Sequence, residues 1–408
     1  MSSVKNKIDP FRHKTHHFFF MVTMIIIAAI GFFASDIYLP SLPAIANYFQ
    51  KSNLQVQLTM SVFLFTMAVF QVFMGALSDK FGRKQILILS TGIFIFASLG
   101  CFKSASLNEL IFFRFLQAIG AASGLSVSQA ILADLFGPVK SAKPLSIMIP
   151  LVAFSPAIAP ILGGLIEEHS NWRNIFLFLA GYGFLIFILL LTPIIPTLSK
   201  TTYSKKLSEK SSASVLQILK NTQFIGFAFF MMTSNACYFA FLAASPFLLN
   251  KYGYSPAQVG YAFCASSFPY MSASFFGRKL SHKLSFIQII FVGLLTDCVG
   301  VLCMLGFAAT NWPHMLSIMI PVFIISIGNG FIMPYSSASA IALYPRNAGL
   351  ITGSLASLQL CAASIGTLAM GILANGTLYP LAIFNLCIVF CALFYFLRVF
   401  RFQLRNAS

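Results

Sequence analysis

The chain has 408 residues, of which 58% are hydrophobic and 9% are charged, and its 26 Lys and Arg against 9 Asp and Glu give a net charge of +17. A soluble domain of this size leaves about a quarter of its chain surface exposed and carries roughly 25% charged residues. The composition therefore excludes a soluble enzyme, a nucleic-acid-binding module and a disordered chain. It leaves a membrane protein that crosses the bilayer several times, and we expect no nucleic acid among its partners.

Apolar stretches long enough to cross a bilayer, which needs about 20 residues, recur along the whole chain. They are continuously apolar rather than alternating, and this favours helices over a β-barrel. We predict an all-α membrane protein with twelve transmembrane helices, at 18–45, 54–77, 86–104, 107–133, 145–166, 174–195, 223–248, 259–277, 285–309, 315–342, 349–374 and 379–397.

The basic residues predict how the chain is oriented. If the N-terminus is cytoplasmic, 21 of the 26 Lys and Arg lie in cytoplasmic segments, four lie on the outer side, and Arg114 lies inside a span. By the positive-inside rule this asymmetry places both termini in the cytoplasm. The excess of positive charge is thus interpreted as a signal for topology.

A polar segment rich in Ser and Lys separates two sets of six spans. We predict an N-terminal bundle over 1–196, a cytoplasmic linker over 197–221 and a C-terminal bundle over 222–408. A Gly-Arg-Lys sequence follows the second span of each half, within 75–84 and 275–283. This placement is the one expected from a six-span duplication.

The loop after the second span carries the most specific motif, GALSDKFGRK over 75–84, with Gly75, Asp79, Gly82, Arg83 and Lys84. Its glycines allow a tight turn, and Asp79 at a helix end can pair with Arg83. The loop resembles the signature loop of the major facilitator superfamily. The resemblance implies a latch that holds the two bundles together on the cytoplasmic side, whereas a plain topology signal is the alternative.

Three further segments are similar to motifs of the same superfamily, at 36–46 in span one, 114–124 in span four and 155–164 in span five. The set most resembles the Bcr/CflA branch of drug:proton antiporters. It implies two pseudo-symmetric six-helix bundles that alternate access to a central cavity. The span-five segment resembles an antiporter motif through Pro156, Pro160, Gly163 and Gly164, although Ala159 replaces the first glycine of that motif.

Ionisable residues inside spans are costly and are functional candidates by default. Asp36 lies in the outer half of span one, and Arg114 lies about 10 Å into span four at 1.5 Å per residue. A buried carboxyl near a guanidinium has a tunable proton affinity, so we predict Asp36 as the proton carrier and Arg114 as its modulator. The alternatives are a helix-boundary role for Asp36 and a structural role for Arg114. For Asp297, in span nine, a neutral packed acid is favoured.

Polar and aromatic residues inside the spans are candidates for lining the substrate cavity, although packing between helices explains each of them equally well. They are Tyr38, Gln117, Asn235, Tyr238, Phe239, Asn329 and Gln359.

The eight Cys have no metal-ligand spacing, and no motif of a hydrolase, metalloprotease or nucleotide-binding enzyme is present. We expect no metal, no catalytic residue and no cofactor beyond a proton gradient.

The leading hypothesis is a proton-coupled exporter of small, largely hydrophobic drugs or metabolites, monomeric and resident in the bacterial inner membrane. Its expected partners are the substrate, protons and lipid. The alternative is an exporter or importer of a dedicated metabolite such as a siderophore, amino acid or peptide. An enzyme or a receptor is disfavoured.

Overall fold

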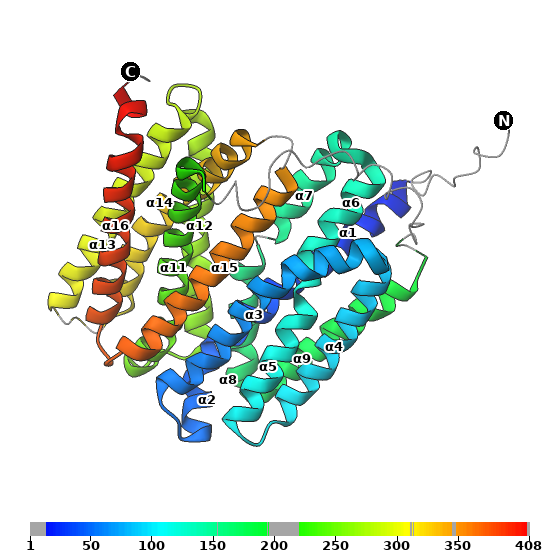
Figure 1. Ribbon diagram of the computed structural model, residues 1–408. Coiled ribbons are helices and arrows are strands. Elements are labelled where there is room, and N and C mark those ends of the chain that lie inside the picture. Colours follow the sequence, from blue (N-terminus) through cyan, green and yellow to red (C-terminus); the bar gives the residue numbers. More distant parts are fainter. Residues whose placement is uncertain are drawn as a thin grey trace, which may run out of the picture.

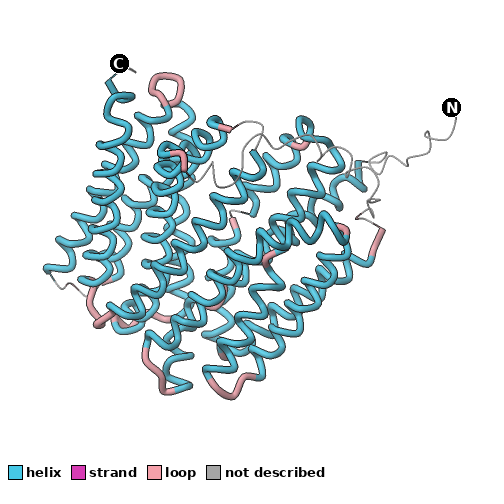
Figure 2. Tube along the Cα trace, in the orientation of Figure 1, coloured by secondary structure: helices cyan, strands magenta, loops and turns pink. Residues whose placement is uncertain are grey.

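The computed structural model describes residues 14–152, 154–193, 195, 220–310, 312, 314–344 and 348–405. Helices joined by short loops make up this described part, which contains no strand (Figure 2). The predicted all-α fold is confirmed. Most of the predicted linker, 197–219, lies outside the described residues.

The first half of the chain supplies six membrane-length segments. Three of them are continuous helices, and three are interrupted within the span. The elements are α1 (Lys14–Asp36), η1 (Leu39–Ser41), α2 (Leu42–Phe49), α3 (Asn53–Phe81), α4 (Arg83–Lys103), α5 (Leu107–Ala121), α6 (Ser123–Lys140), α7 (Ala142–Val152), α8 (Ser155–His169) and α9 (Trp172–Leu191).

The second half supplies six continuous helices over its described residues. They are α11 (Thr222–Lys251), α12 (Pro256–Leu280), α13 (Phe286–Thr310), α14 (Met315–Leu343), α15 (Ala348–Leu373) and α16 (Tyr379–Arg405). Eleven spans of the described chain are long and apolar enough to cross a membrane. The twelfth, α12, has the length but is less apolar, with four Ser, two Tyr and the cations Arg278 and Lys279 in its last turn.

The duplication predicted from the Gly-Arg-Lys sequences is visible again where the second span of each half begins. Ser52 caps α3 in a capping box with Gln55, and Ser255 caps α12 in the same way with Gln258. A capping box satisfies backbone N–H groups that the first turn of a helix leaves unpaired. Both halves therefore start their second helix with the same Ser-x-x-Gln device.

The first span is not the single helix that the apolar stretch 18–45 predicts. The helix α1 ends at Asp36, a 3₁₀ turn follows, and α2 continues to Phe49. Pro40 and Pro43 lie in this stretch, and proline removes a backbone donor and clashes with the preceding helical turn. The break places Asp36 at a helix end within the span.

The start of α1 and the end of α16 lie at the same side of the molecule (Figure 1). We call this the terminal side and the opposite side the far side. The halves pack together through α3 with α15 and α8 with α12, and η1 and α2 contact α11 at the far side. One apolar core runs through the first half and into the far-side parts of the second.

A second apolar core is confined to the second half near the terminal side. It contains Phe224, Phe230, Tyr335, Phe396 and Phe400. The first core enters the second half only at its far side, and the second core belongs to one half alone. The two halves are therefore joined more closely at the far side.

Candidate functional site

Arg114 is the centre of the buried polar network in the first half. The helix α5, capped by Ser106, carries its guanidinium into the interior, where the side chain has no exposed surface. Nη1 donates hydrogen bonds to the backbone oxygen of Ala34 at 3.1 Å and to Gln117 Oε1 at 2.6 Å. Gln117 in turn donates to Ser98 Oγ at 2.7 Å. The predicted candidates Arg114 and Gln117 are thus direct neighbours.

Two aromatic rings flank the same guanidinium. The Arg114 Cζ atom is 4.3 Å from the centroid of Tyr38 and 4.0 Å from that of Phe63. A desolvated cation–π contact stabilises a charge by about 2 kcal/mol or more. The Nε and Nη2 atoms have no hydrogen-bond partner among the described residues. Arg114 therefore holds its charge in the interior with two donors available to a further group.

Asp36 lies at the end of α1, beside this network. Its side chain is 2% exposed, and Ser35 Oγ donates to its Oδ1 at 2.6 Å. The last carbonyls of a helix lack intrahelical partners, and Arg114 donates to one of them, that of Ala34. The helix break thus brings Arg114 to the backbone two residues before the predicted proton carrier.

No direct ion pair joins Asp36 and Arg114 among the described residues, where both salt bridges involve Arg83. Asp36 ends α1 just before η1, and η1 contacts α11 and α12 of the opposite half. The acid therefore lies where the two halves meet, with the guanidinium near but not bound to it. The assignment of Asp36 and Arg114 to proton coupling stays a prediction.

A second polar cluster lies in the second half, on α11, α14 and α15. Asn235 Nδ2 donates to Gln359 Oε1 at 3.0 Å and approaches Met333 Sδ at 3.8 Å. Gln359 Nε2 approaches Met231 Sδ at 4.0 Å. Two of the predicted cavity residues, Asn235 and Gln359, thus pair with each other beside the sulfur atoms of Met231 and Met333. Each of the two polar residues is partly buried.

The other predicted cavity residues have different neighbours. Tyr238 packs edge-on against Phe239, which is buried. Tyr38 is buried on Arg114, with its hydroxyl 3.3 Å from Thr59 Oγ1. Asn329 is buried, and its Oδ1 has no partner among the described residues. Their predicted contact with substrate stays a prediction.

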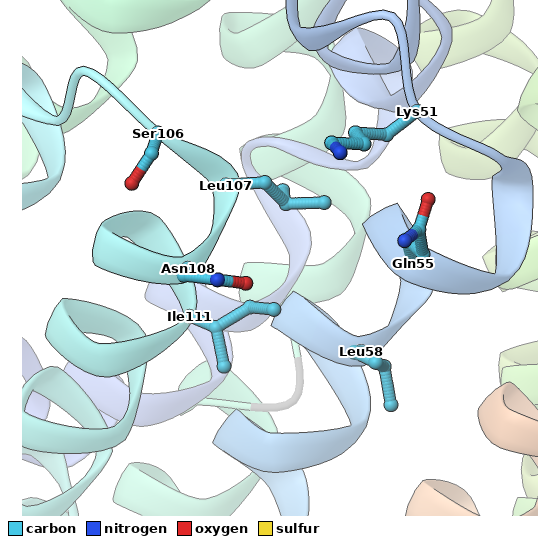
Figure 3. Close-up of a pocket in the computed structure, with 7 residues that line it drawn as sticks. All are labelled: Lys51, Gln55, Leu58, Ser106, Leu107, Asn108 and Ile111. Atoms are coloured by element: carbon cyan, nitrogen blue, oxygen red, sulfur yellow. The ribbon is translucent and has the colours of Figure 1, made fainter.

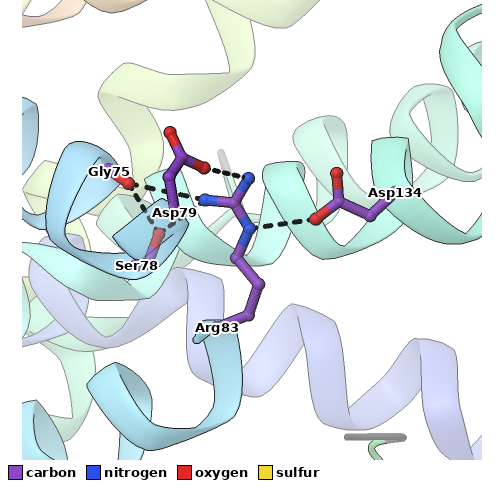
Figure 4. A network of polar contacts seen from close by, with 5 residues as sticks. All are labelled: Gly75, Ser78, Asp79, Arg83 and Asp134. Carbon is purple, nitrogen blue, oxygen red and sulfur yellow. Dashed lines mark hydrogen bonds and ion pairs between the residues drawn. The ribbon is translucent and has the colours of Figure 1, made fainter. Parts of the chain in front are cut away.

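The signature loop folds around Arg83 (Figure 4). Arg83 forms an ion pair with Asp79 and donates from Nε to Asp134 Oδ2 at 3.0 Å. Its Nη1 donates to Ser78 Oγ at 2.6 Å, and Gly82 adopts a φ of +107° that favours glycine. The sequence prediction missed Asp134, one residue beyond the predicted span 107–133; an acid at a span end is the signal that could have indicated it.

The rest of the loop also contacts the first half only. Lys84 Nζ donates to the backbone oxygen of Thr192 at 2.9 Å, and a Cβ added to Gly75 would meet open space. In this conformation every described polar contact of the loop lies within the N-terminal half. The expected latch between the halves is therefore not engaged here and stays a prediction for another conformation.

The segment that resembles the antiporter motif lies on α8, where it packs tightly. A Cβ added to Gly163 would lie 1.5 Å from the Ile37 oxygen, and one added to Gly164 would lie 2.3 Å from the Pro256 oxygen of α12. The oxygen of Pro160 faces Gly260 of α12 equally closely. Pro156 begins the same helix. Gly164 and Gly260 thus bring backbones of the two halves into contact, whereas Gly163 packs against Ile37 within the first half.

Glu168, which sequence reasoning did not single out, joins the halves at the end of the same helix. Its Oε2 accepts hydrogen bonds from Ser255 Oγ at 3.0 Å and from the Ala257 N–H at 3.2 Å, at the start of α12. A carboxylate is favourable at a helix N-terminus. The far side is thus closed by polar as well as by backbone contacts.

A pocket lies between α3 and α5 near the far side (Figure 3). Its lining includes Lys51, Gln55, Ser106 and Asn108. None of the candidate residues lines it.

Twelve spans in two packed halves, a buried guanidinium beside a helix break and a glycine-rich contact between the halves define a membrane transporter. A model of the Major Facilitator Superfamily matches residues 24–255 and 227–406, and the chain belongs to this superfamily. The membership predicted from the motifs is confirmed.

Two similar proteins indicate the branch of the superfamily. The chain is 26% identical over 384 residues to a bicyclomycin resistance protein homolog of Haemophilus influenzae, covering 93% of this chain and 96% of that protein. It is 28% identical over 334 residues to the multidrug resistance protein MdtL of Salmonella paratyphi A, covering 81% and 82%. Both support the drug:proton antiporter branch.

A solved structure has the same fold. It is a bacterial homolog of the human lysosomal transporter Spinster in an inward-facing and occupied conformation, 15% identical with a TM-score of 0.75. The match covers 97% of this chain and 98% of that one.

Proposed function

We propose that this transporter exports small, largely hydrophobic compounds in exchange for protons. The observation that carries the proposal is the placement of Asp36 at a helix break, next to η1, which contacts α11 and α12 of the opposite half. Beside it lies the buried Arg114, two of whose nitrogens have no hydrogen-bond partner among the described residues. A carboxyl at the contact between two moving halves can bind a proton in one conformation and release it in the other.

Alternating access is supported by the unequal closure of the two sides. The far side is joined by α8 and α12, through Gly164, Gly260 and Glu168, whereas the loop at Arg83 makes its polar contacts within the first half. With the predicted topology, the far side faces outward and the cytoplasmic side is the open one. In the opposite conformation the signature loop would hold the halves together.

The substrate class is inferred from the interior groups that could receive it. The Asn235–Gln359 pair lies among Met231 and Met333, and Tyr238 presents an aromatic ring on the same helix as Asn235. Such a surface is mostly apolar with a few polar groups, as is usual for binding sites of small hydrophobic ligands. Methionine side chains also adapt to ligands of different shape.

The membrane location of the chain follows from its spans and family. Residence in a bacterial inner membrane, cytoplasmic termini and action as a monomer complete the proposal. The proton gradient is its energy source, and no bound cofactor takes part.

Ethidium uptake into inverted membrane vesicles tests the proposal. Wild-type protein should concentrate ethidium when the vesicle interior is acidified, and Asp36→Asn should abolish this uptake while inserting normally. Glu109→Gln is the matched control, because Glu109 is an exposed acid that accepts the Ala105 N–H at the start of α5. Equal uptake by wild type and Asp36→Asn would refute the coupling role.

The same vesicles also distinguish the proposed exporter from the alternative transporter. An importer, or a carrier of a dedicated metabolite, would leave ethidium outside and would be detected only with its own substrate. A panel of antibiotics in an efflux-deficient host then gives the breadth of the exported compounds.

A further inference from the structure

A second acid is buried in the membrane-spanning region, in the opposite half from Asp36. Asp297 lies on α13, eleven residues after Phe286 and thirteen before Thr310, and its side chain is 1% exposed. At 1.5 Å per residue it is about 17 and 20 Å from the two helix ends, near the middle of the bilayer. Nothing in the proposed coupling at Asp36 uses it.

No cation is paired with this acid in the part of the chain that the structure describes. Its Oδ1 has no hydrogen-bond partner among the described residues, and neither described salt bridge involves it. An ionised carboxylate without a partner in the membrane interior costs several kcal/mol. The side chain therefore carries a proton in this conformation.

The titratable groups around Asp297 are few. The packed helix α14 contains Tyr335 and no Asp, Glu, Lys, Arg or His, and Cys237 of α11 lies within electrostatic range. On α16, Cys387, Cys391, Tyr395 and the terminal-side Arg398, Arg401 and Arg405 are the titratable residues besides Tyr379 at the far-side end. On α13 itself only Cys298 and Cys303 titrate.

A niche for the carboxyl is built from glycines where α13 and α14 touch. A Cβ added to Gly328 would lie 2.0 Å from Asp297 Oδ1, and one added to Gly293 would lie 2.9 Å from the Gly328 oxygen. Gly300 meets Pro321 of α14 in the same manner, at 3.1 Å. The contact leaves no room for a hydrated carboxylate, so ionisation of Asp297 would require the two helices to separate.

The helix that forms this niche also reaches the polar cluster of the second half. Five residues after Gly328, Met333 contacts Asn235, which pairs with Gln359. A shift of α14 on α13 would therefore move a group that we expect to meet substrate.

We propose that Asp297 is a second proton-binding site of the transporter, at which proton loss loosens α14 from α13 and proton binding restores their contact. The proposal deepens the proposed function and rests on it for the link to transport. On binding, the carboxylate forms an O–H bond with a proton from water, and the reverse step returns that proton to water on the other side.

Infrared spectroscopy of the purified full-length protein tests the site without any substrate. A protonated carboxyl band should be present in the wild type, weaker by the contribution of one carboxyl in Asp297→Asn, and shifted when the solvent is exchanged for D₂O. Gly328→Ala should alter the band because its Cβ enters the niche, whereas Gly306→Ala, which meets open space, should not. A band of equal strength in the wild type and Asp297→Asn, or one that D₂O leaves unshifted, would overturn the proposal.

Transport gives the second readout. Asparagine has the shape of the protonated acid, so a purely structural Asp297 would tolerate Asp297→Asn with no effect on transport. If its proton is coupled, the steady-state ethidium gradient at a pH difference of one unit should fall about tenfold, because each coupled proton contributes about 1.36 kcal/mol per pH unit. An unchanged gradient would overturn the coupling.

The two proposals fail in different ways. If the wild type shows no proton-driven ethidium transport, the proposed function is wrong, and the D₂O shift alone then decides whether Asp297 exchanges a proton. If the wild type and Asp297→Asn reach the same gradient while Asp36→Asn is inactive, the proposed function stands and the second site is refuted.

Discussion

Gly164→Ala should loosen the far-side contact between the two halves. The added Cβ would lie 2.3 Å from the Pro256 oxygen, 2.8 Å from its carbonyl carbon and 2.9 Å from the Ala257 Cα. All three are backbone atoms, which cannot rotate out of the way. Ordinary contact begins at 3.4 Å, so α8 and α12 would have to separate by about 1 Å.

The magnitude follows from the cost of overpacking. Inserting a methyl into a well-packed contact costs about 1–3 kcal/mol. The alanine clashes only while the far side is closed, so most of this cost should act on the balance between conformations. A bias of that size corresponds to a shift of about 5- to 150-fold in the populations of two states.

Hydrogen–deuterium exchange measures this shift, and it requires no label to be attached to any of the eight native cysteines. Peptides from α8 and from the first two turns of α12 should exchange faster in Gly164→Ala by a similar factor. Gly181→Ala on α9 is the matched control, since its Cβ meets open space. Equal exchange in Gly164→Ala and wild type would refute the inferred contact between the halves.

Two other variants test the remaining clusters. Asp134→Asn should lower the melting temperature more than Asp79→Asn, because Asp134 is 12% and Asp79 47% exposed beside Arg83, and losing a charged hydrogen bond costs about 1.5–3 kcal/mol; equal melting temperatures would contradict this. Gln359→Leu should weaken ethidium binding by removing the acceptor of Asn235, while the dependence of transport on the pH gradient stays that of wild type. Unchanged binding, measured by fluorescence titration, would exclude this pair from the substrate site.

The fold could be predicted from the sequence because a helix needs about 20 apolar residues to cross a bilayer, so that each long apolar run predicts one span. Eleven of the predicted spans recur as helices of sufficient length and hydropathy, and α12 completes the twelve. The motif loop predicted the turn at Gly82 and the pair of Asp79 with Arg83, since both depend on neighbours in sequence.

Interruptions inside spans were harder to predict. An apolar window registers hydropathy and not backbone continuity, so the break after Asp36 was not predicted, although Pro40 and Pro43 follow it closely in the sequence. Because α1 ends at this break, the carbonyl of Ala34 is free to accept the hydrogen bond from Arg114.

Contacts between residues far apart in the sequence could not be predicted from local sequence patterns. Asp134 beside Arg83 and Glu168 at the start of α12 depend on how helices pack across the fold. The same is true of the Gly328 niche for Asp297, where a neutral packed acid was predicted but its neighbour on α14 could not be named.

The central claim, that substrate moves in exchange for protons through Asp36, is tested most directly by following both fluxes in proteoliposomes. Ethidium added to liposomes with an imposed pH gradient should accelerate the collapse of that gradient in step with its own movement. Asp36→Asn should move neither protons nor ethidium against the gradient. Ethidium transport by the wild type without proton movement, or wild-type fluxes in Asp36→Asn, would contradict the account.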